Sequence, residues 1–326
     1  MAELIDYSRF SEYHTPKRKS KWPFFLILLI VSIFLVLFAK NQLAVKKSLG
    51  EVISPLSKNV VDSGIELLYT HDNSKKLESI VQKELSGTKG NYAVVIKNLK
   101  TGERYYYNEH KTFETASLYK LFVMGTVFQN IQNGTMKHSD ILSEEITVLN
   151  EKFKIASVSA ELTEGKITLP VETALQRMIT ISDNYSALLL AAKVHLSKVA
   201  LFLEQNSLNE STVGTSGEEP TTTANNMELF FKKLYEEDLA NKIYTYEMLT
   251  LLKNQKLNGK IPKYLPKNIT ISHKTGELGR LSHDAGIVYT PSGDYVLIVL
   301  TETNSQVVAN EKISNISKGV YDYFTK

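Results

Sequence analysis

The sequence has no cysteine among its 326 residues. Disulfide bonds, thiolate zinc sites, a cysteine nucleophile and a lipid-modified cysteine are therefore all excluded. An excess of charge is missing too. The formal net charge is only +3 and no long basic run lies in the main body, so we expect no nucleic acid partner.

The signatures of several other enzyme classes are also missing. There is no G-x-S-x-G nucleophile elbow, no H-E-x-x-H zinc helix and no G-x-x-x-x-G-K-[ST] phosphate loop. The seven histidines are scattered, and we interpret His273 and His283 as strand-packing residues. We therefore expect neither a metal site nor a cofactor.

A long uncharged segment lies near the N-terminus, at residues 22–39. At 1.5 Å per residue it nearly spans a hydrocarbon core of ~30 Å. Basic residues within 17–21 favour a cytoplasmic N-terminus. A cleavable signal peptide is the alternative, but such segments are shorter and end in small residues, whereas this one ends in Phe38-Ala39-Lys40. We therefore expect a single-pass anchor in the cell membrane, which places the residues after it outside the cytoplasm.

The flanking segments complete the expected domain organisation. Residues 1–21 form a short polar cytoplasmic tail. Residues 40–72 form a spacer, with apolar residues at helical period interrupted by Pro55. Residues 73–326 form the main domain, in which Asn73 is expected to cap the first helix.

The main domain begins and ends with β-rich runs and has a long helical region between them. Two runs joined by the turn 98–102 predict a hairpin, and three more follow the helical region. We expect an α+β domain: one five-stranded, mainly antiparallel sheet built from both chain ends, flanked by helices, plus an all-helical subdomain. The expected strands are 92–96, 104–107, 269–274, 285–289 and 295–300, and the expected helices include 73–85, 117–133, 171–181, 185–196, 227–235 and 309–324.

Residues 113–124 have the pattern of a helix start, which Thr115 is expected to cap. Ser117 and Lys120 are three residues apart, so a helix places both side chains on one face. A hydroxyl beside an amine whose pKa is lowered by burial forms a serine–lysine nucleophile pair. The alternative is a core-facing helix that happens to carry both residues.

Three short motifs follow one another along the chain. They are S-x-x-K at 117–120, S-D-N at 182–184 and K-T-G at 274–276, a set shared by class A β-lactamases and penicillin-binding proteins. Two look-alikes occur earlier, S-x-x-K at 86–89 and K-T-G at 100–102. Glycines at 87 and 90 disfavour a helix in the first, and the second coincides with the predicted hairpin turn. Lys274 is instead expected to end a strand.

With these residues the chain resembles the serine β-lactamase and penicillin-recognising superfamily, most closely class A β-lactamase-like domains, over roughly residues 74–325. The resemblance implies a serine hydrolase that opens β-lactams or related acyl-amides through an acyl-enzyme. It also extends beyond the motif cores, to segments 113–117, 178–181, 221–227 and 283–286.

The resemblance also implies individual catalytic roles. Ser117 is the acylated nucleophile and Lys120 its activating base. Ser182 relays a proton to the leaving nitrogen and is held near Lys274, whose charge attracts a substrate carboxylate.

Substrate binding is implied for four further residues. Thr275 hydrogen-bonds the substrate carboxylate, and Asn184 positions the amide side chain of the substrate. Gly276 completes the K-T-G motif. The backbone N–H groups of Ser117 and Glu277 form the oxyanion hole.

One departure from the family concerns the release of the acyl group. The E-x-x-L-N segment that activates water in class A enzymes is missing. Glu219-Pro220 matches only its first two positions, because Thr221 to Thr223 follow at once. Glu219 is thus either a general base or a solvated charge, and Glu210 and Glu218 are weaker candidates.

Two alternatives to a turning-over β-lactamase therefore stay open. One is a slow-turnover penicillin- or peptidoglycan-binding envelope protein. The other is a cell-wall peptidase or esterase with the same nucleophile.

Glu277 also stands where the family usually has a small or hydroxyl residue, which adds negative charge near the site.

Overall fold

A computed structural model describes residues 74–215 and 217–326. Its centre is one five-stranded sheet in the order β2-β1-β9-β8-β7, with all neighbours antiparallel. Two strands come from the start of the domain and three from its end, so the predicted assembly from both chain ends is confirmed. The strands are β1 (Asn91–Asn98), β2 (Arg104–Tyr107), β7 (Ile271–Leu278), β8 (Leu281–Val288) and β9 (Tyr295–Glu302).

Both faces of the sheet are buried, as the alternation along β1 shows. Val94 and Ile96 belong to the apolar cluster on one face, while Ala93 and Val95 belong to the cluster on the other. Successive side chains of a strand point to opposite faces. The strand is therefore apolar at consecutive positions because it separates two cores.

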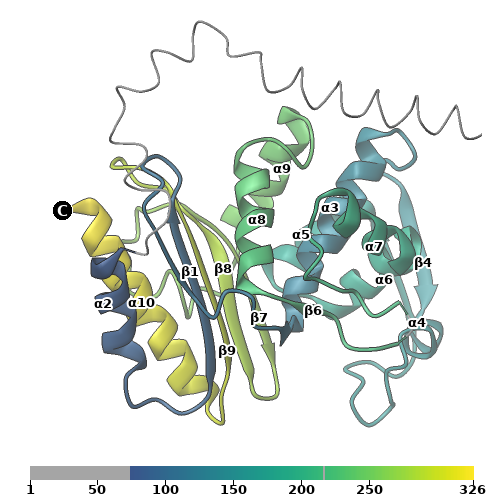
Figure 1. Ribbon diagram of the computed structural model, residues 1–326. Helices are drawn as coiled ribbons and strands as arrows, with labels where there is room; N and C mark the ends of the chain where they lie inside the picture. The colour runs from purple at the N-terminus through teal and green to yellow at the C-terminus, as the bar shows by residue number, and fades with distance from the viewer. Residues whose placement is uncertain (1–73, 216) are drawn as a thin grey trace, which may run out of the picture. The chain divides into compact units, whose positions relative to one another are not determined.

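Two helices from opposite ends of the domain cover one face of the sheet (Figure 1). In α2 (Lys75–Leu85) the residues Leu77, Val81 and Leu85 are buried, spaced one turn apart. Its partner is α10 (Gln306–Thr325). Ser74 Oγ caps α2 by accepting a hydrogen bond from the backbone N–H of Leu77, so the prediction of Asn73 as the cap is wrong. Both residue types can cap, and sequence patterns do not fix a helix start to one residue.

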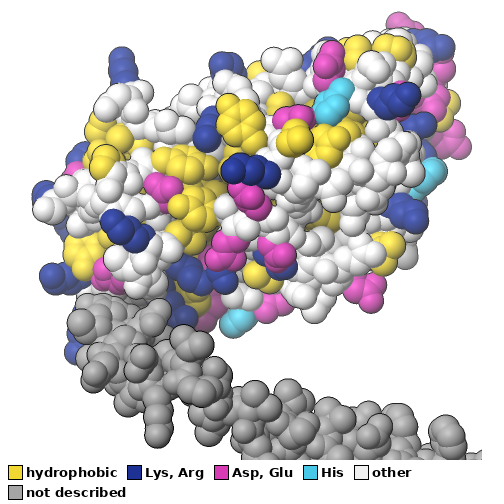
Figure 2. Space-filling model, turned by 90° about the horizontal axis from the view of Figure 1, so that it is seen from above, with side chains coloured by type: hydrophobic (Ala, Val, Ile, Leu, Met, Phe, Trp, Pro, Cys, Tyr) yellow, Lys and Arg dark blue, Asp and Glu magenta, His cyan; other side chains and the backbone are white. Residues whose placement is uncertain are grey.

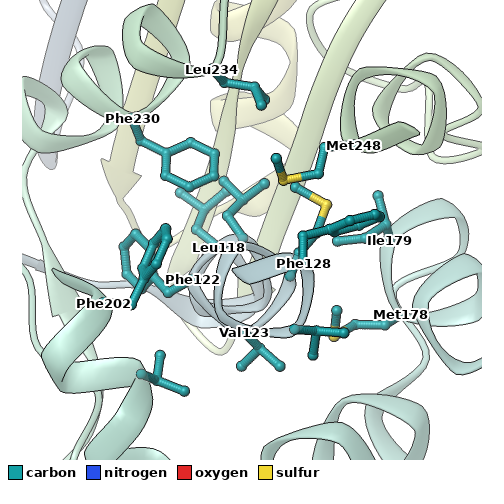
Figure 3. Packing of buried hydrophobic residues seen from close by; sticks show 14 of the residues in the cluster. Leu118, Phe122, Val123, Phe128, Met178, Ile179, Phe202, Phe230, Leu234 and Met248 are labelled. Atoms are coloured by element: carbon teal, nitrogen blue, oxygen red, sulfur yellow. The ribbon is translucent and has the colours of Figure 1, made fainter. Parts of the chain in front are cut away.

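The helical region packs on the opposite face, around α3 (Tyr119–Gln132). Figure 3 shows side chains such as Phe122, Val123 and Phe128 pointing outward from α3 into surrounding helices. A helix that is apolar on all sides belongs in an interior. The surrounding helices are α4 (Ile146–Lys152), α5 (Val171–Thr180), α6 (Asn184–Val194), α7 (Leu196–Gln205), α8 (Ala224–Tyr235) and α9 (Lys242–Lys253).

The subdomain is not all-helical as predicted. It contains a two-stranded antiparallel sheet, β4 (Ile141–Glu145) with β5 (Lys166–Pro170). A second short pairing joins β3 (Phe113–Glu114) to β6 (Thr221–Thr222). β3 and β6 have only two residues each and β4 has no apolar alternation. β5 alternates at Ile167 and Leu169 but is short and ends at Pro170, so its sequence does not identify it as a strand.

The described surface mixes charges of both signs, as the face in Figure 2 shows. Within the described residues, no single helix has the length and apolarity needed to cross a membrane, and α6 and α7 meet that test only as a pair bent by 81°. The predicted tail, anchor and spacer, residues 1–72, lie outside the described residues.

Candidate active site

Ser117 lies in a 3-10 turn, η3 (Ala116–Leu118), that runs directly into α3. Ala116 before it has φ of 44°, a left-handed conformation that is uncommon for a residue other than glycine. Thr115 stands at the N-cap position of this turn, but its side chain makes no capping hydrogen bond: its Oγ1 donates to the carbonyl of Ala116 at 3.0 Å, and its backbone is already helical. The prediction of a Thr115 cap is therefore wrong, since the chain enters the helix through a tight turn instead.

Lys120, one turn after Ser117, is completely buried. Its Nζ donates to the Ser182 carbonyl at 2.5 Å, to Ser182 Oγ at 3.2 Å and to Asn184 Oδ1 at 2.6 Å. Burial lowers the pKa of Lys120 to about 8, although the negative charges of Asp183 and Glu161 partly oppose this shift. A lysine with such a pKa is neutral in part at neutral pH and can accept a proton.

The loop between α5 and α6 holds Ser182 in a left-handed conformation with φ of 60°. Asp183 fixes this loop, because it accepts from the backbone N–H of Ser186 at 2.7 Å and bonds Arg177 at 2.8 Å. Asp183 is the N-cap of α6 and supports the loop. The result is a Ser182 hydroxyl that points at two lysines.

The second of these lysines is Lys274, which is also fully buried. Its Nζ donates to Ser182 Oγ at 2.9 Å and to the Thr275 carbonyl at 2.7 Å. Burial is the main cause that holds the pKa of Lys274 well below its usual range, and the nearby cation of Lys120 lowers it further. Lys274 does not end a strand as predicted, because β7 continues to Leu278 through its pairing with β8.

Gly276 lets β7 pass close to the turn that carries Ser117. A Cβ at this position would lie 2.9 Å from the Thr115 carbonyl oxygen and 3.3 Å from the Ser117 nitrogen. Only glycine leaves room for this approach. Glu277 is the next residue of β7. The N–H groups of Ser117 and Glu277, predicted to form the oxyanion hole, therefore come from two segments that lie side by side.

Two hollows meet at Ser117. The larger has a volume of about 370 Å³ and the smaller about 160 Å³. Ser117, Asn184 and Glu277 line both of them. The larger one is also lined by Ser182, Leu257, Gly259, Lys260, Thr275 and Asn310, and the smaller one by Glu114, Thr115, Ala116, Tyr119, Glu219, Pro220 and Leu278.

The sequence model of the Beta-lactamase enzyme family matches residues 75–324. The chain belongs to this family. It is accordingly a β-lactamase-like serine hydrolase.

Individual relatives of this β-lactamase-family chain are distant in sequence. The β-lactamase VEB-1 of Pseudomonas aeruginosa is 23% identical over 282 residues, which cover 79% of this chain and 93% of VEB-1. A β-lactamase structure from Sphaerobacter thermophilus superimposes with a TM-score of 0.67 at 24% identity, over 77% of this chain and 97% of the other. The structure of PBP-A superimposes with a TM-score of 0.66 at 20% identity, over 77% of this chain and 96% of PBP-A. At such identities the structural likeness shows the fold.

Sequence reasoning missed two residues at the site of this β-lactamase-like hydrolase. Lys260 is 1% exposed, and its Nζ lies 2.7 Å from Glu277 Oε1 and 3.2 Å from the His283 carbonyl. Glu161 Oε1 accepts a hydrogen bond from Asn184 Nδ2 at 2.5 Å. Both residues lie in loops without a motif, so no local signal pointed to them.

Of the three candidate glutamates, Glu219 lines the smaller hollow beside Ser117. Glu210 is bound elsewhere, since it accepts from Thr223 Oγ1 at 2.6 Å and contacts His110 at 2.9 Å. Glu218 is exposed and lines neither of the two hollows described above.

The other residues considered in the sequence analysis, the two look-alike motifs and the two strand histidines, have roles in folding and packing. Ser86 is the C-cap of α2, and 100–102 lie in the β1–β2 turn, so neither look-alike motif has the geometry of a site. His283 is buried with its Nε2 at 2.9 Å from the Glu114 carbonyl, and burial lowers its pKa to about 4. His273 Nδ1 lies within hydrogen-bond distance of Asp284 Oδ1, at 2.9 Å. Among the described residues, no group of three or more His, Cys, Asp or Glu side chains could hold a metal ion.

Proposed function

We propose that this chain opens β-lactams, or related acyl-amides of the cell wall, through an acyl-enzyme on Ser117. The observation that best supports this proposal is the Ser182 hydroxyl, which lies 3.2 Å from Lys120 Nζ and 2.9 Å from Lys274 Nζ. A hydroxyl between two buried lysine side chains is placed to give up its proton and to regain one from a protonated lysine.

Acylation begins with the neutral form of Lys120. In the resting arrangement three acceptors take all three N–H donors of its ammonium, so the group must first lose a proton. The free amine then takes the Ser117 proton while Ser117 Oγ attacks the substrate carbonyl carbon. The oxyanion that forms is held by the N–H groups of Ser117 and Glu277.

Collapse of the tetrahedral intermediate breaks the carbon–nitrogen bond. The leaving nitrogen takes its proton from Ser182 Oγ, which regains one from Lys120. Lys260 and Thr275 line the larger hollow, where an ammonium group and a hydroxyl suit the substrate carboxylate.

Release of the acyl group needs a second proton acceptor near Ser117. Glu219 is the candidate, because it lines the smaller hollow together with Ser117. A water molecule there would give its proton to the Glu219 carboxylate and attack the ester carbon.

Fluorescent penicillin followed by intact mass measurement tests the nucleophile. We expect one adduct on the wild-type chain and none on Ser117→Ala. Ser86→Ala is the matched control, because Ser86 heads the look-alike motif at the end of α2, and it should retain the adduct. An adduct that survives Ser117→Ala overturns the assignment.

A second candidate function is a penicillin- or peptidoglycan-binding protein that acylates but barely turns over. The shortened segment after Glu219-Pro220 favours it. The likeness to PBP-A supports it as well, since a variant of that protein was solved as an acyl-enzyme complex with penicillin G. Steady multiple turnovers of nitrocefin exclude this candidate. A single burst without turnover supports it. A peptidase or esterase acting on cell-wall peptides would use the same residues, and hydrolysis of such a peptide would identify it.

The location is proposed from the N-terminal sequence. Residues 22–39 would anchor the chain in the cell membrane with residues 1–21 in the cytoplasm and the hydrolase domain outside. External protease added to intact cells should digest the hydrolase domain and leave the tail. Protection of the domain until the cells are lysed contradicts this location.

A further inference from the structure

Cations and carboxylates occupy different depths around Ser117. Lys120 and Lys274 are fully buried and Lys260 is 1% exposed. Glu161 and Glu219 are exposed. A bound substrate would therefore meet lysine side chains at the floor of the site and exposed carboxylates at its edge.

The two exposed carboxylates converge from different loops. Glu161 precedes β5 and accepts from Asn184 Nδ2 at 2.5 Å, while Glu219 precedes β6 and lines the smaller hollow with Asn184. The half-buried Tyr119, which also lines the smaller hollow, is influenced by both carboxylates. Its pKa is raised first by burial and then by the negative charges of Glu161 and Glu219.

These carboxylates differ from the third acid at the site. Glu277 is paired with Lys260 at 2.7 Å. Within the described part of the chain, neither Glu161 nor Glu219 forms a salt bridge. Asn184 stands between Glu161 and the Lys120 amine, so neither of the two exposed carboxylates is in direct contact with a cation among the described residues, whereas Lys260 and Thr275 line the larger hollow.

We propose that Glu161 and Glu219 form an acidic rim that selects substrates with a positively charged amine on the acyl side of the scissile bond. This inference rests on the proposed function and names its substrate class. The preferred substrate is an acyl-amide with a carboxylate on the leaving side, toward Lys260 and Thr275, and an ammonium group on the acyl side, toward the rim.

Three penicillins provide a matched set of probes. Penicillin G, ampicillin and carbenicillin share one ring system and differ at one side-chain carbon, which bears hydrogen, an amine or a carboxylate. The measured quantity is the second-order rate constant for acylation of Ser117 in the full chain. At about pH 6.5 the α-amino group of ampicillin is mainly protonated.

The acidic rim predicts that the acylation rate constant is highest for ampicillin, lower for penicillin G and lowest for carbenicillin. Successive values should differ by roughly three- to fivefold, as expected for exposed charge pairs. Glu161→Gln should reduce the ampicillin-to-carbenicillin ratio by about that factor while keeping an oxygen acceptor for Asn184. Glu164→Gln removes the same charge from an exposed residue of the same loop, and should leave the ratio unchanged. Salt at about 0.5 M should compress the ratio, because it screens exposed charges.

The outcomes separate this inference from the proposed function. Equal rates for the three penicillins, or a preference that neither Glu161→Gln nor salt changes, overturn the acidic rim and leave the serine hydrolase intact. Failure of all three penicillins to acylate Ser117 overturns both. The expected order, with its ampicillin-to-carbenicillin ratio reduced in Glu161→Gln and unchanged in Glu164→Gln, establishes the rim.

Discussion

The Lys274 ammonium group lies 2.9 Å from the Ser182 hydroxyl, although 92 residues separate them in the chain. Lys120 Nζ reaches the same hydroxyl from the other side at 3.2 Å. Two like charges on one oxygen raise the energy of having both lysines protonated. The arrangement therefore favours the loss of a proton from one lysine, which the proposed acylation requires.

The rate of acylation should rise with pH through the pKa of Lys120, about 8. The base is the neutral amine, so its fraction increases as pH rises through that value and levels off above it. Stopped-flow acylation between about pH 6 and pH 10 measures the profile. A rate that is flat or falls across this range contradicts the role of Lys120.

Lys120→Arg tests the same role without removing the positive charge. An arginine stays protonated at all accessible pH values, so acylation should fall by roughly 10²–10⁴-fold, as for loss of a general base. Lys89→Arg, in the look-alike motif, is the matched control and should acylate at the wild-type rate.

Gly276→Ala should destabilise the fold by about 1–3 kcal/mol, the usual cost of overpacking. The added Cβ would lie 2.9 Å from the Thr115 carbonyl oxygen and would push β7 away from the Ser117 turn. Urea unfolding measures the change. Gly259→Ala is the control, since no atom lies within 4 Å of its Cβ position. Equal stability of the two variants would show that β7 does not need the close approach.

Glu219→Gln should lengthen the acyl-enzyme lifetime by roughly 10²–10⁴-fold if this carboxylate activates the deacylating water. Mass spectrometry of the penicillin adduct over time measures the lifetime. Glu218→Gln changes the neighbouring charge and should not lengthen it. An unchanged lifetime in Glu219→Gln removes Glu219 from the mechanism and favours the slow-turnover candidate.

The buried His283 should make stability depend on pH. Burial lowers its pKa from 6.5 to about 4. Between these two pH values the unfolded chain therefore binds a proton at His283 that the folded chain does not bind. The free energy of unfolding should therefore fall by about 3 kcal/mol as pH drops from about 6.5 to about 4, with no further loss from this group below that. Urea unfolding across this range measures it, and His283→Asn should show a smaller decrease. Constant stability from about pH 6.5 to pH 4 contradicts the prediction.

The predictions that failed share a cause. The caps at Thr115 and Asn73 and the strand end at Lys274 are choices among neighbouring residues that local patterns do not distinguish. At Lys274 the pairing of β7 with β8 extends the strand through Gly276 and Glu277, residues that favour a strand poorly on their own. The small sheet was missed because β4 has no apolar alternation, and β5, which alternates at Ile167 and Leu169, is short and ends at a proline.

The amino-acid sequence by itself determined the sheet from both chain ends, the helical segment that begins near Ser117 and carries Lys120, and the order of the three motifs. Those features follow from spacing within a helix or strand, which local geometry sets. The family resemblance also implied that Ser182 lies near Lys274, but only the tertiary structure buried Lys260 against Glu277 and placed Glu161 on Asn184. These contacts join segments far apart in sequence, and packing of the two cores decides which side chains meet there.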